Sequence, residues 1–174
     1  MTVGTVDISL SEALSALTGS SVNTQTHTIL FDIRLPRILL AIAVGAVLAS
    51  TGAVMQGLFR NPLADPSLIG VSSGASVGAS LMIVTAGGFI QSGVLVGLSL
   101  VAVGAFIGGF AATLLVYRLA TSGIGTSVTT MLLAGIAIAA LAGALNSLLS
   151  YFSDNDMLRQ ISLWQMGNLS GASW

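Results

Sequence analysis

Apolar positions dominate four long stretches of the chain, and the few charged residues lie between or outside them. The ranges 38–58, 68–85, 94–117 and 128–152 contain no charged side chain. A helix of about 20 apolar residues is long enough to cross the hydrocarbon core of a bilayer. A charged side chain at the centre of such a helix costs about 2.5–3.5 kcal/mol. The pattern therefore predicts four membrane-spanning helices at these ranges.

The boundaries between the predicted spans follow from turn-forming residues. The first span is bracketed by two segments predicted to be loops, Arg34-Leu-Pro-Arg37 and Arg60-Asn-Pro-Leu-Ala-Asp-Pro66. The uncharged segment 66–117 is too long for one span. Its Gly87-Gly88 pair, followed by Gln91-Ser92-Gly93, predicts the turn between the second and third spans.

Two more polar regions flank the spans. Residues 1–32 are predicted to form a short surface helix over residues 6–17, with Ser9 or Ser11 as its cap, followed by a loop over Thr18–Thr28. Residues 153–174 mix apolar and charged positions and include Trp164 and Trp174. Tryptophan is enriched at membrane–water interfaces, so this tail is predicted to form a short interfacial helix.

Glycines and alanines recur at four-residue steps within the predicted spans. Small residues at that spacing line one face of a helix and allow a neighbouring helix to approach closely in lipid. The glycines that we expect to form such packing faces are Gly45, Gly70, Gly74, Gly78, Gly104, Gly108, Gly135 and Gly143.

Composition agrees with a membrane protein and excludes several function classes. Hydrophobic residues make up 54% of the chain and charged residues 6%, whereas soluble domains carry about 25% charged residues. The chain has no lysine and a formal net charge of −1, which argues against nucleic-acid binding. It has no cysteine, so neither a disulfide framework nor a thiolate metal site is expected. No secretory signal pattern precedes the first span.

Catalytic and metal-binding motifs find little support. Gly70-Val-Ser-Ser-Gly74 matches the G-x-S-x-G nucleophile elbow in letters, but it lies in a predicted membrane helix. The single histidine, His27, has no second histidine or cysteine to share a metal with. A Walker A motif needs a lysine, which this chain lacks. We therefore expect no catalytic residue, no metal site and no cofactor.

The predicted spans also lack carboxylates and histidines, which argues against an ion-coupled carrier. Neutral polar residues remain within them, including Ser76, Asn146 and Ser147. These side chains either line a path for a bulky solute or form hydrogen bonds between helices. Arg34 and Arg37 either anchor a helix end at the interface or dock an acidic partner. The arginine count on the two sides does not fix the orientation.

Six motifs, in order along the chain, resemble the permeases of iron–siderophore, heme and cobalamin ABC importers. They are Arg34-Leu-Pro-Arg37, Gly52-Ala-Val-Met-Gln-Gly57, Arg60-Asn-Pro-Leu-Ala-Asp-Pro66, Gly70-Val-Ser-Ser-Gly-Ala75, Leu133-Ala-Gly135 and Trp164-Gln-Met-Gly-Asn-Leu169. The run Leu133–Leu145 most resembles the heme branch of this family.

The resemblance implies an all-α, polytopic permease of ten helices in the bacterial cytoplasmic (inner) membrane. This chain would supply about four of those helices and is expected to be a fragment. The implied partners are a second permease subunit, forming a homodimer, two ABC ATPase subunits, a periplasmic or lipoprotein solute-binding protein and the bilayer. ATP hydrolysis is then expected on the separate ATPase subunit.

The resemblance also implies roles for individual residues. Arg34 and Arg37 match the outward-facing arginines that pair with glutamates of the binding protein. Leu63, Thr126 and Ser127 match positions that narrow the cytoplasmic end of the pathway. Residues 1–32 and 153–174 would then lie outside. The expected function is translocation of an iron chelate, heme or a ferric siderophore; an ion-coupled secondary carrier and a non-transporting membrane scaffold are the alternatives.

Overall fold

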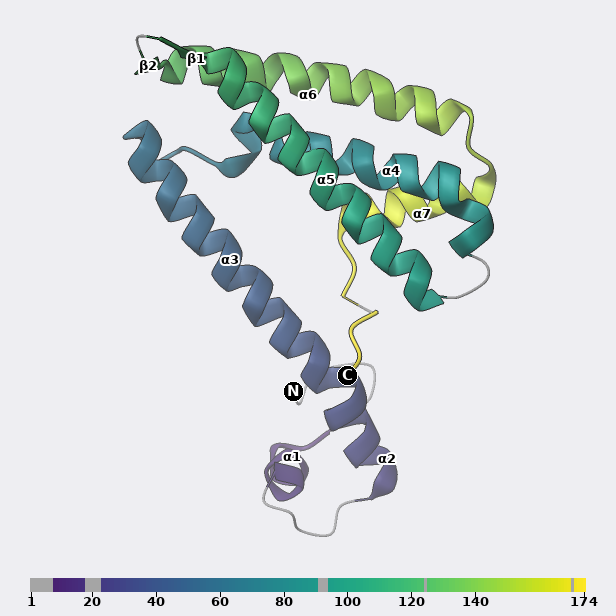
Figure 1. Cartoon of the computed structure of the whole chain (residues 1–174). Helices are drawn as coiled ribbons and strands as arrows, with labels where there is room; N and C mark the ends of the chain where they lie inside the picture. The colour runs from purple at the N-terminus through teal and green to yellow at the C-terminus, as the bar shows by residue number, and fades with distance from the viewer. Residues whose placement is uncertain (1–7, 18–22, 91–93, 124, 170) are drawn as a thin grey trace. The chain divides into compact units, whose positions relative to one another are not determined.

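The computed structural model describes residues 8–17, 23–90, 94–123, 125–169 and 171–174, and these residues are mostly helical (Figure 1). The helices are α1 (Leu10–Leu17), α2 (Thr24–His27), the π-helix η1 (Thr28–Arg34), α3 (Leu35–Phe59), the 3-10 helix η2 (Pro66–Ile69), α4 (Val71–Ile90), α5 (Val94–Ala120), α6 (Val128–Tyr151) and α7 (Asn155–Met166). Two short strands, β1 (Thr121–Ser122) and β2 (Gly125–Thr126), pair antiparallel. The prediction of an all-α fold is confirmed.

The chain divides into two compact units, which are described separately. The first comprises Met1–Ser50 and Asn168–Trp174, and the second comprises Thr51–Gly167. In the first unit, Ile8 and Leu30 are buried against each other, and Ala16, Ile29 and Phe31 pack around them. The N-terminus of α1 is capped reciprocally: the Glu12 N–H donates to Ser9 Oγ at 3.2 Å and the Ser9 N–H donates to the Glu12 carboxylate at 2.9 Å.

The polar residues ahead of the first predicted span are helical, where the sequence analysis predicted loops. Helical structure runs without a break from Thr24 through Arg34-Leu-Pro-Arg37 into α3. Proline normally disrupts a helix because it has no N–H and its ring crowds the preceding turn. Here the turn before Pro36 is π-helical, with the Leu35 N–H bonded to the Leu30 carbonyl five residues earlier. The wider turn accommodates the proline. Residues 18–22 of the predicted loop lie outside the described residues.

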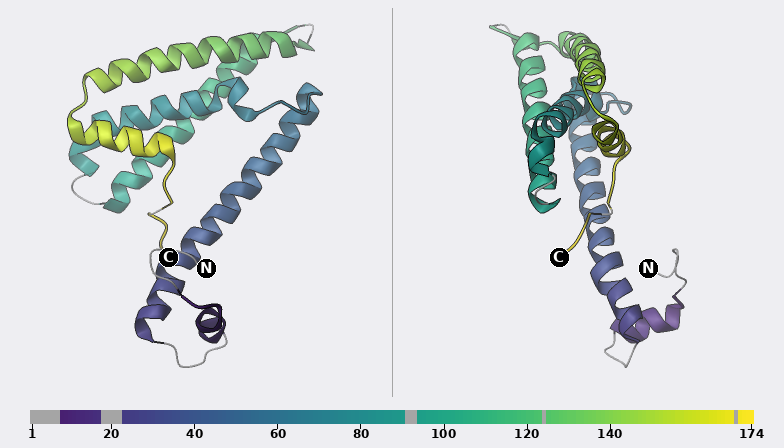
Figure 2. Two further views of the ribbon diagram at one scale, coloured as in Figure 1. Left: turned by 180° about the vertical axis from the view of Figure 1, so that it is seen from behind. Right: turned by 90° about the vertical axis from the view of Figure 1, so that its right-hand side faces the viewer.

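In the second unit, α4 is the central helix. It contacts α5, α6, α7 and η2, and the views in Figures 1 and 2 show it between α5 and α7. One apolar cluster joins Ala79 and Ile83 of α4, Val101 of α5 and Ile161 of α7. A second joins Val116, Ala120 and Met131, with Phe59 and Ile69 packed against it.

The boundaries of α4 differ from those predicted. The 3-10 turn η2 covers the predicted start of the span, and α4 continues through Gly87-Gly88 to Ile90. A glycine within a helix costs only about 1 kcal/mol relative to alanine, so the pair does not by itself end the helix. The rest of the predicted turn, residues 91–93, lies outside the described residues.

Among the described residues, three helices are long and apolar enough to cross a membrane: Thr24–Phe59, Leu100–Ala120 and Val128–Tyr151. A shorter apolar helix runs from Val71 to Ala86. These helices also expose many large apolar side chains, such as Leu48, Phe106 and Leu141, which is the surface expected of helices that face lipid or other helices. The chain is a multi-pass membrane protein.

Candidate functional site

The two arginines proposed to dock a partner lie one helical turn apart. Arg34 is the last residue of η1 and Arg37 lies in the first turn of α3. Arg37 is exposed, Arg34 is partly buried, and Pro36 between them is buried. The two arginines therefore lie on neighbouring turns of one continuous helical segment, and arginine is the side chain that pairs bidentately with carboxylates.

The loop that carries Leu63 is held by four local hydrogen bonds. Arg60 adopts a left-handed conformation with φ of 47°. The Arg60 N–H bonds to the Gly57 carbonyl at 3.3 Å and the Asn61 N–H to the Gln56 carbonyl at 3.2 Å, which is a Schellman ending for α3. The Asn61 side chain then accepts the Leu63 N–H at 2.9 Å, and the Ala64 N–H bonds to the Asn61 carbonyl at 3.1 Å.

These bonds present Leu63 as an outward apolar residue that is 85% exposed. The next residues start η2, where Asp65 Oδ1 accepts the Ser67 N–H at 2.8 Å. Hydrogen bonds from the side chain and backbone of Ser67 lower the pKa of the Asp65 carboxyl. The ionised form of Asp65 is therefore favoured, and its carboxylate caps the start of η2 where the loop ends.

The other two residues proposed to narrow the cytoplasmic end, Thr126 and Ser127, lie at the hairpin between α5 and α6. The Thr126 hydroxyl lies 3.0 Å from the Thr121 hydroxyl across the strand pair. Ser127 caps α6 by accepting the Thr130 N–H at 3.3 Å. The Thr126 hydroxyl thus contacts the paired strand and the Ser127 hydroxyl caps α6. Any narrowing of a solute pathway would come from the position of the hairpin that carries them.

Glycines of α4 and α5 lie directly against each other. A Cβ placed on Gly78 would overlap the Gly104 carbonyl oxygen, and one placed on Gly74 would overlap the Gly108 carbonyl oxygen. A Cβ on Gly135 of α6 would likewise overlap the Leu68 carbonyl oxygen in η2. These pairs bring backbone against backbone, so no side chain fits between the helices at these points.

The remaining glycines of the predicted packing faces have different surroundings. Gly70 ends η2 with φ of 77°, a conformation that favours glycine, and lies beside Ile138 of α6. Among the described residues, no atom lies within 4 Å of a Cβ built on Gly45 or Gly143. Any packing role for these last two stays a prediction.

Three neutral polar side chains meet in the second unit, from α4, α6 and α7. The Asn146 amide donates to Ser76 Oγ at 3.1 Å, and the Gln165 amide donates to the same oxygen at 3.3 Å. Asn146 Oδ1 is buried and has no hydrogen-bond partner among the described residues. Ser76 and Asn146 are the kind of polar residues that the sequence analysis assigned either to a path or to bonds between helices. Here they form such a bond, and Gln165, which was not singled out, joins them.

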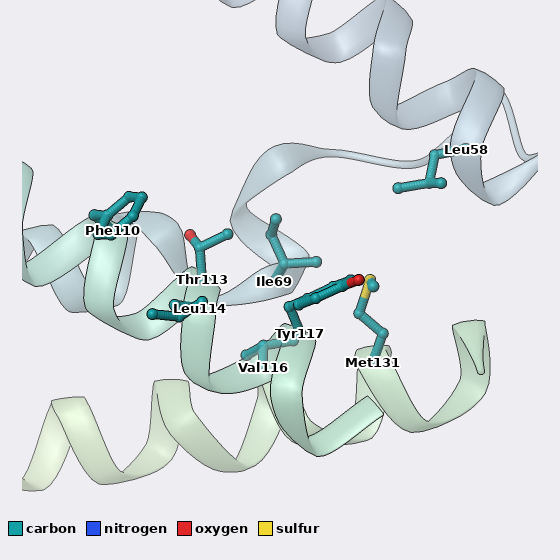
Figure 3. Close-up of a pocket in the computed structure, with 8 residues that line it drawn as sticks. All are labelled: Leu58, Ile69, Phe110, Thr113, Leu114, Val116, Tyr117 and Met131. Atoms are coloured by element: carbon teal, nitrogen blue, oxygen red, sulfur yellow. The ribbon is translucent and has the colours of Figure 1, made fainter. Parts of the chain in front are cut away.

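An apolar pocket of about 280 Å³ lies between the end of α3, η2, α5 and α6 (Figure 3). Its lining is Leu58, Ile69, Phe110, Thr113, Leu114, Val116, Tyr117 and Met131. The Thr113 hydroxyl already donates to the Gly109 carbonyl at 2.8 Å. Ligand sites for larger molecules usually measure about 300–1,000 Å³. The pocket therefore offers a bound molecule an almost wholly apolar surface, with few polar groups to fix its orientation.

The catalytic and metal motifs are not supported by the geometry. Ser72 and Ser73 lie in the first turn of α4, after a left-handed glycine and a 3-10 turn, whereas a nucleophile elbow follows a strand. His27 stacks on Phe31 with ring centroids 4.6 Å apart. Among the described residues, no three histidine or acidic side chains gather where they could hold a metal ion.

The comparison with known families covers the whole chain. Residues 1–174 match the model of the FecCD transport family. The chain belongs to the FecCD transport family. This membership agrees with the six motifs noted in the sequence and with the membrane helices described above.

Curated relatives and a solved structure support the same family. The chain is 47% identical over 165 residues to the hemin transport system permease protein HmuU of Yersinia pestis, which covers 95% of this chain and 48% of that protein. It is 45% identical over 148 residues to the cobalamin import system permease protein BtuC of Halobacterium salinarum, covering 85% and 38%. A solved structure described as an inward-facing conformation of a metal-chelate type ABC transporter has a TM-score of 0.77 at 33% identity, and the match covers 99% of this chain and 49% of the other.

This FecCD-family chain therefore spans less than half the length of the relatives that it matches. The solved structure matches nearly all of this chain, and the match covers about half of the solved chain. The activity, substrate and partners of a whole transporter are consequently inferences, which follow below.

Proposed function

We propose that this chain is part of the membrane-spanning permease subunit of an ATP-binding-cassette importer. The complete subunit would translocate an iron chelate across the cytoplasmic membrane, with heme as the preferred substrate and a ferric siderophore as the second choice. The observation that carries the proposal is the match of all 174 residues to the FecCD transport family, together with relatives named for hemin and cobalamin transport.

The chemistry of the described helices suits a large chelate. Hemin and cobalamin are both bulky metal macrocycles, and the two relatives named for them are almost equally similar to this chain. The membrane helices contain no charged residue from Ile38 to Phe59, from Pro66 to Tyr117 or from Leu119 to Ser153. Walls without fixed charges do not bind a chelate tightly, so release is not slowed. Selectivity would then lie mainly in a solute-binding protein.

The partners follow from the same proposal. A separate ABC ATPase pair would supply the energy, since this chain has no lysine for a Walker A motif. A periplasmic or lipoprotein binding protein would dock by pairing its own glutamates with Arg34 and Arg37. A second permease subunit would complete the pathway. Leu63, at the tip of its hydrogen-bonded loop, and the Thr126-Ser127 hairpin end would narrow the cytoplasmic side.

Uptake by the reconstituted importer tests the proposal. The complete permease, its ATPase and its binding protein would be placed in proteoliposomes, and entry of hemin measured with ATP, without ATP and with a proton ionophore. We expect uptake that requires ATP and survives the ionophore. Uptake abolished by the ionophore and independent of ATP would instead support a secondary carrier. No uptake of hemin, ferric siderophore or cobalamin would leave a scaffold as the better account.

A further inference from the structure

The π-helical turn before Pro36 leaves one carbonyl without its helical partner. In η1 the Leu35 N–H bonds to the Leu30 carbonyl, five residues back. The next bond in the same register would run from residue 36 to the Phe31 carbonyl. Residue 36 is proline and has no N–H, so this bond cannot form. An unpaired carbonyl within a helix near the membrane is costly.

A residue far along the chain takes the place of that missing donor. The Trp174 indole Nε1–H donates to the Phe31 carbonyl oxygen at 2.8 Å. Both residues belong to the first unit. The Trp174 side chain is 73% exposed, so its ring makes little packing contact. The hydrogen bond is therefore the main contact that this side chain contributes.

The rest of Phe31 is held as well. Its ring stacks on His27 and packs against the cluster of Ile8 and Leu30. The Phe31 ring is thus held by His27 and the cluster of Ile8 and Leu30, and the Phe31 carbonyl is held by Trp174. The backbone that follows within six residues carries Arg34 and Arg37.

We infer that Trp174 is a positioning residue for the docking arginines: its indole N–H fills the acceptor that Pro36 leaves open at Phe31 and so fixes the π-helical turn that orients Arg34 and Arg37. The inference rests on the proposed docking role of these arginines. The partner is a protein surface that carries carboxylates, and Trp174 acts through the backbone without touching it.

A double-mutant cycle in the complete importer tests this inference. The variants are Trp174→Phe, which keeps an aromatic ring but removes the N–H donor, Pro36→Ala, which restores a backbone donor at residue 36, and the combination of both. Trp164→Phe is the matched control, because Trp164 lies in α7 and packs against the Ile161 cluster. Two quantities are measured: amide hydrogen exchange over residues 31–37, and the Kd for the binding protein.

We expect Trp174→Phe to speed exchange over residues 31–37 about two- to tenfold, the range of one net hydrogen bond, and to raise the Kd at least twofold. In the Pro36→Ala background the same substitution should change neither quantity, because an N–H from residue 36 is again available. Trp164→Phe should leave exchange in this segment unchanged.

Each other outcome overturns a defined part of the reasoning. If Trp174→Phe changes exchange and Kd equally in the Pro36 and Pro36→Ala backgrounds, the effect of Trp174 does not depend on the acceptor that Pro36 leaves open, and the inference fails. Faster exchange without a change in Kd would remove the role in docking. If the Arg34→Glu, Arg37→Glu double variant docks normally, the proposed docking role itself fails, and the exchange data alone still decide whether Trp174 fixes the turn.

Discussion

The contact between Gly78 of α4 and Gly104 of α5 gives the sharpest prediction about stability. A Cβ on Gly78 would overlap the Gly104 carbonyl oxygen, lie 2.8 Å from its carbonyl carbon and lie 3.2 Å from the Gly108 Cα. All three are backbone atoms, so no rotamer change relieves the overlap. Gly78→Ala can be accommodated only if the two helices move apart.

Gly45→Ala is the matched control. Gly45 lies within α3, and among the described residues no atom lies within 4 Å of a Cβ built there. Both substitutions replace a glycine within a helix by alanine, so both gain about 1 kcal/mol of helix propensity. The difference between the two variants then isolates the steric cost, which for overpacking is about 1–3 kcal/mol.

The assay measures the free energy of unfolding of the complete permease in lipid bicelles by a steric-trap or denaturant titration. We expect Gly78→Ala to be less stable than Gly45→Ala by about 1–3 kcal/mol. Gly143→Ala, a second open position in α6, should behave like Gly45→Ala. Equal stabilities of all three variants would refute the backbone contact between α4 and α5.

Three further predictions concern charge and polarity. Arg34→Glu with Arg37→Glu should weaken docking of the binding protein at least tenfold in a surface-binding assay, because repulsion of carboxylates replaces their attraction; unchanged docking removes the assigned role. Ser76→Ala should destabilise the permease by about 0.6–1.7 kcal/mol, and it should cost less in an Asn146→Leu background, which the same unfolding titration measures; additive effects would mean the two do not interact. The pKa of Asp65 is lowered from 3.8, so ionised Asp65 should stabilise the loop above pH 3.8 and lose this effect as the pH falls through the lowered pKa. Asp65→Asn should therefore remove the fall in thermal midpoint that acid causes in this pH range. A fall that persists in Asp65→Asn would point to another group.

The sequence was sufficient to predict the helices that follow from local pattern. Long uncharged stretches bounded by Arg37, Arg60, Asp65 and Arg118 give the apolar helices, because charge is excluded from the membrane interior. The polar residues up to Thr28 and the proline-containing segment Arg34–Arg37 predict loops, whereas the structure is helical from Thr24 onward. In the structure this segment includes a π-helical turn and accepts a hydrogen bond from a residue 143 positions away, and no local pattern reveals either feature.

Glycine spacing shows a similar limit. Gly45, Gly78, Gly104 and Gly143 all occur at four-residue steps with other small residues. Of these four, Gly78 and Gly104 face a neighbouring backbone in the described structure, whereas Gly45 and Gly143 do not. Spacing fixes which residues share a helix face, but the partner of that face depends on how the helices pack. The same holds for Gln165, whose contact with Ser76 depends on α7 folding back along α4.

The contacts between α4 and its neighbours are made by backbone and neutral side chains, and this has a consequence for how the helices can move. A glycine contact between α4 and α5 allows almost no separation without losing its dispersion energy, which falls steeply with distance. Asn146 and Gln165 each donate one hydrogen bond to Ser76 Oγ. Asn146 Oδ1 accepts no hydrogen bond from the described residues. Such bonds can exchange partners at small cost.

If the proposed importer rocks between inward-facing and outward-facing states, we therefore expect α4 and α5 to move as one body, with α6 and α7 shifting against them at Ser76. A disulfide between cysteines placed at Ala79 and Val101, whose side chains share one core cluster, should leave ATP-driven uptake intact, whereas one between Ser76 and Asn146 should stop it; inhibition by the first cross-link would show that α4 and α5 separate during transport.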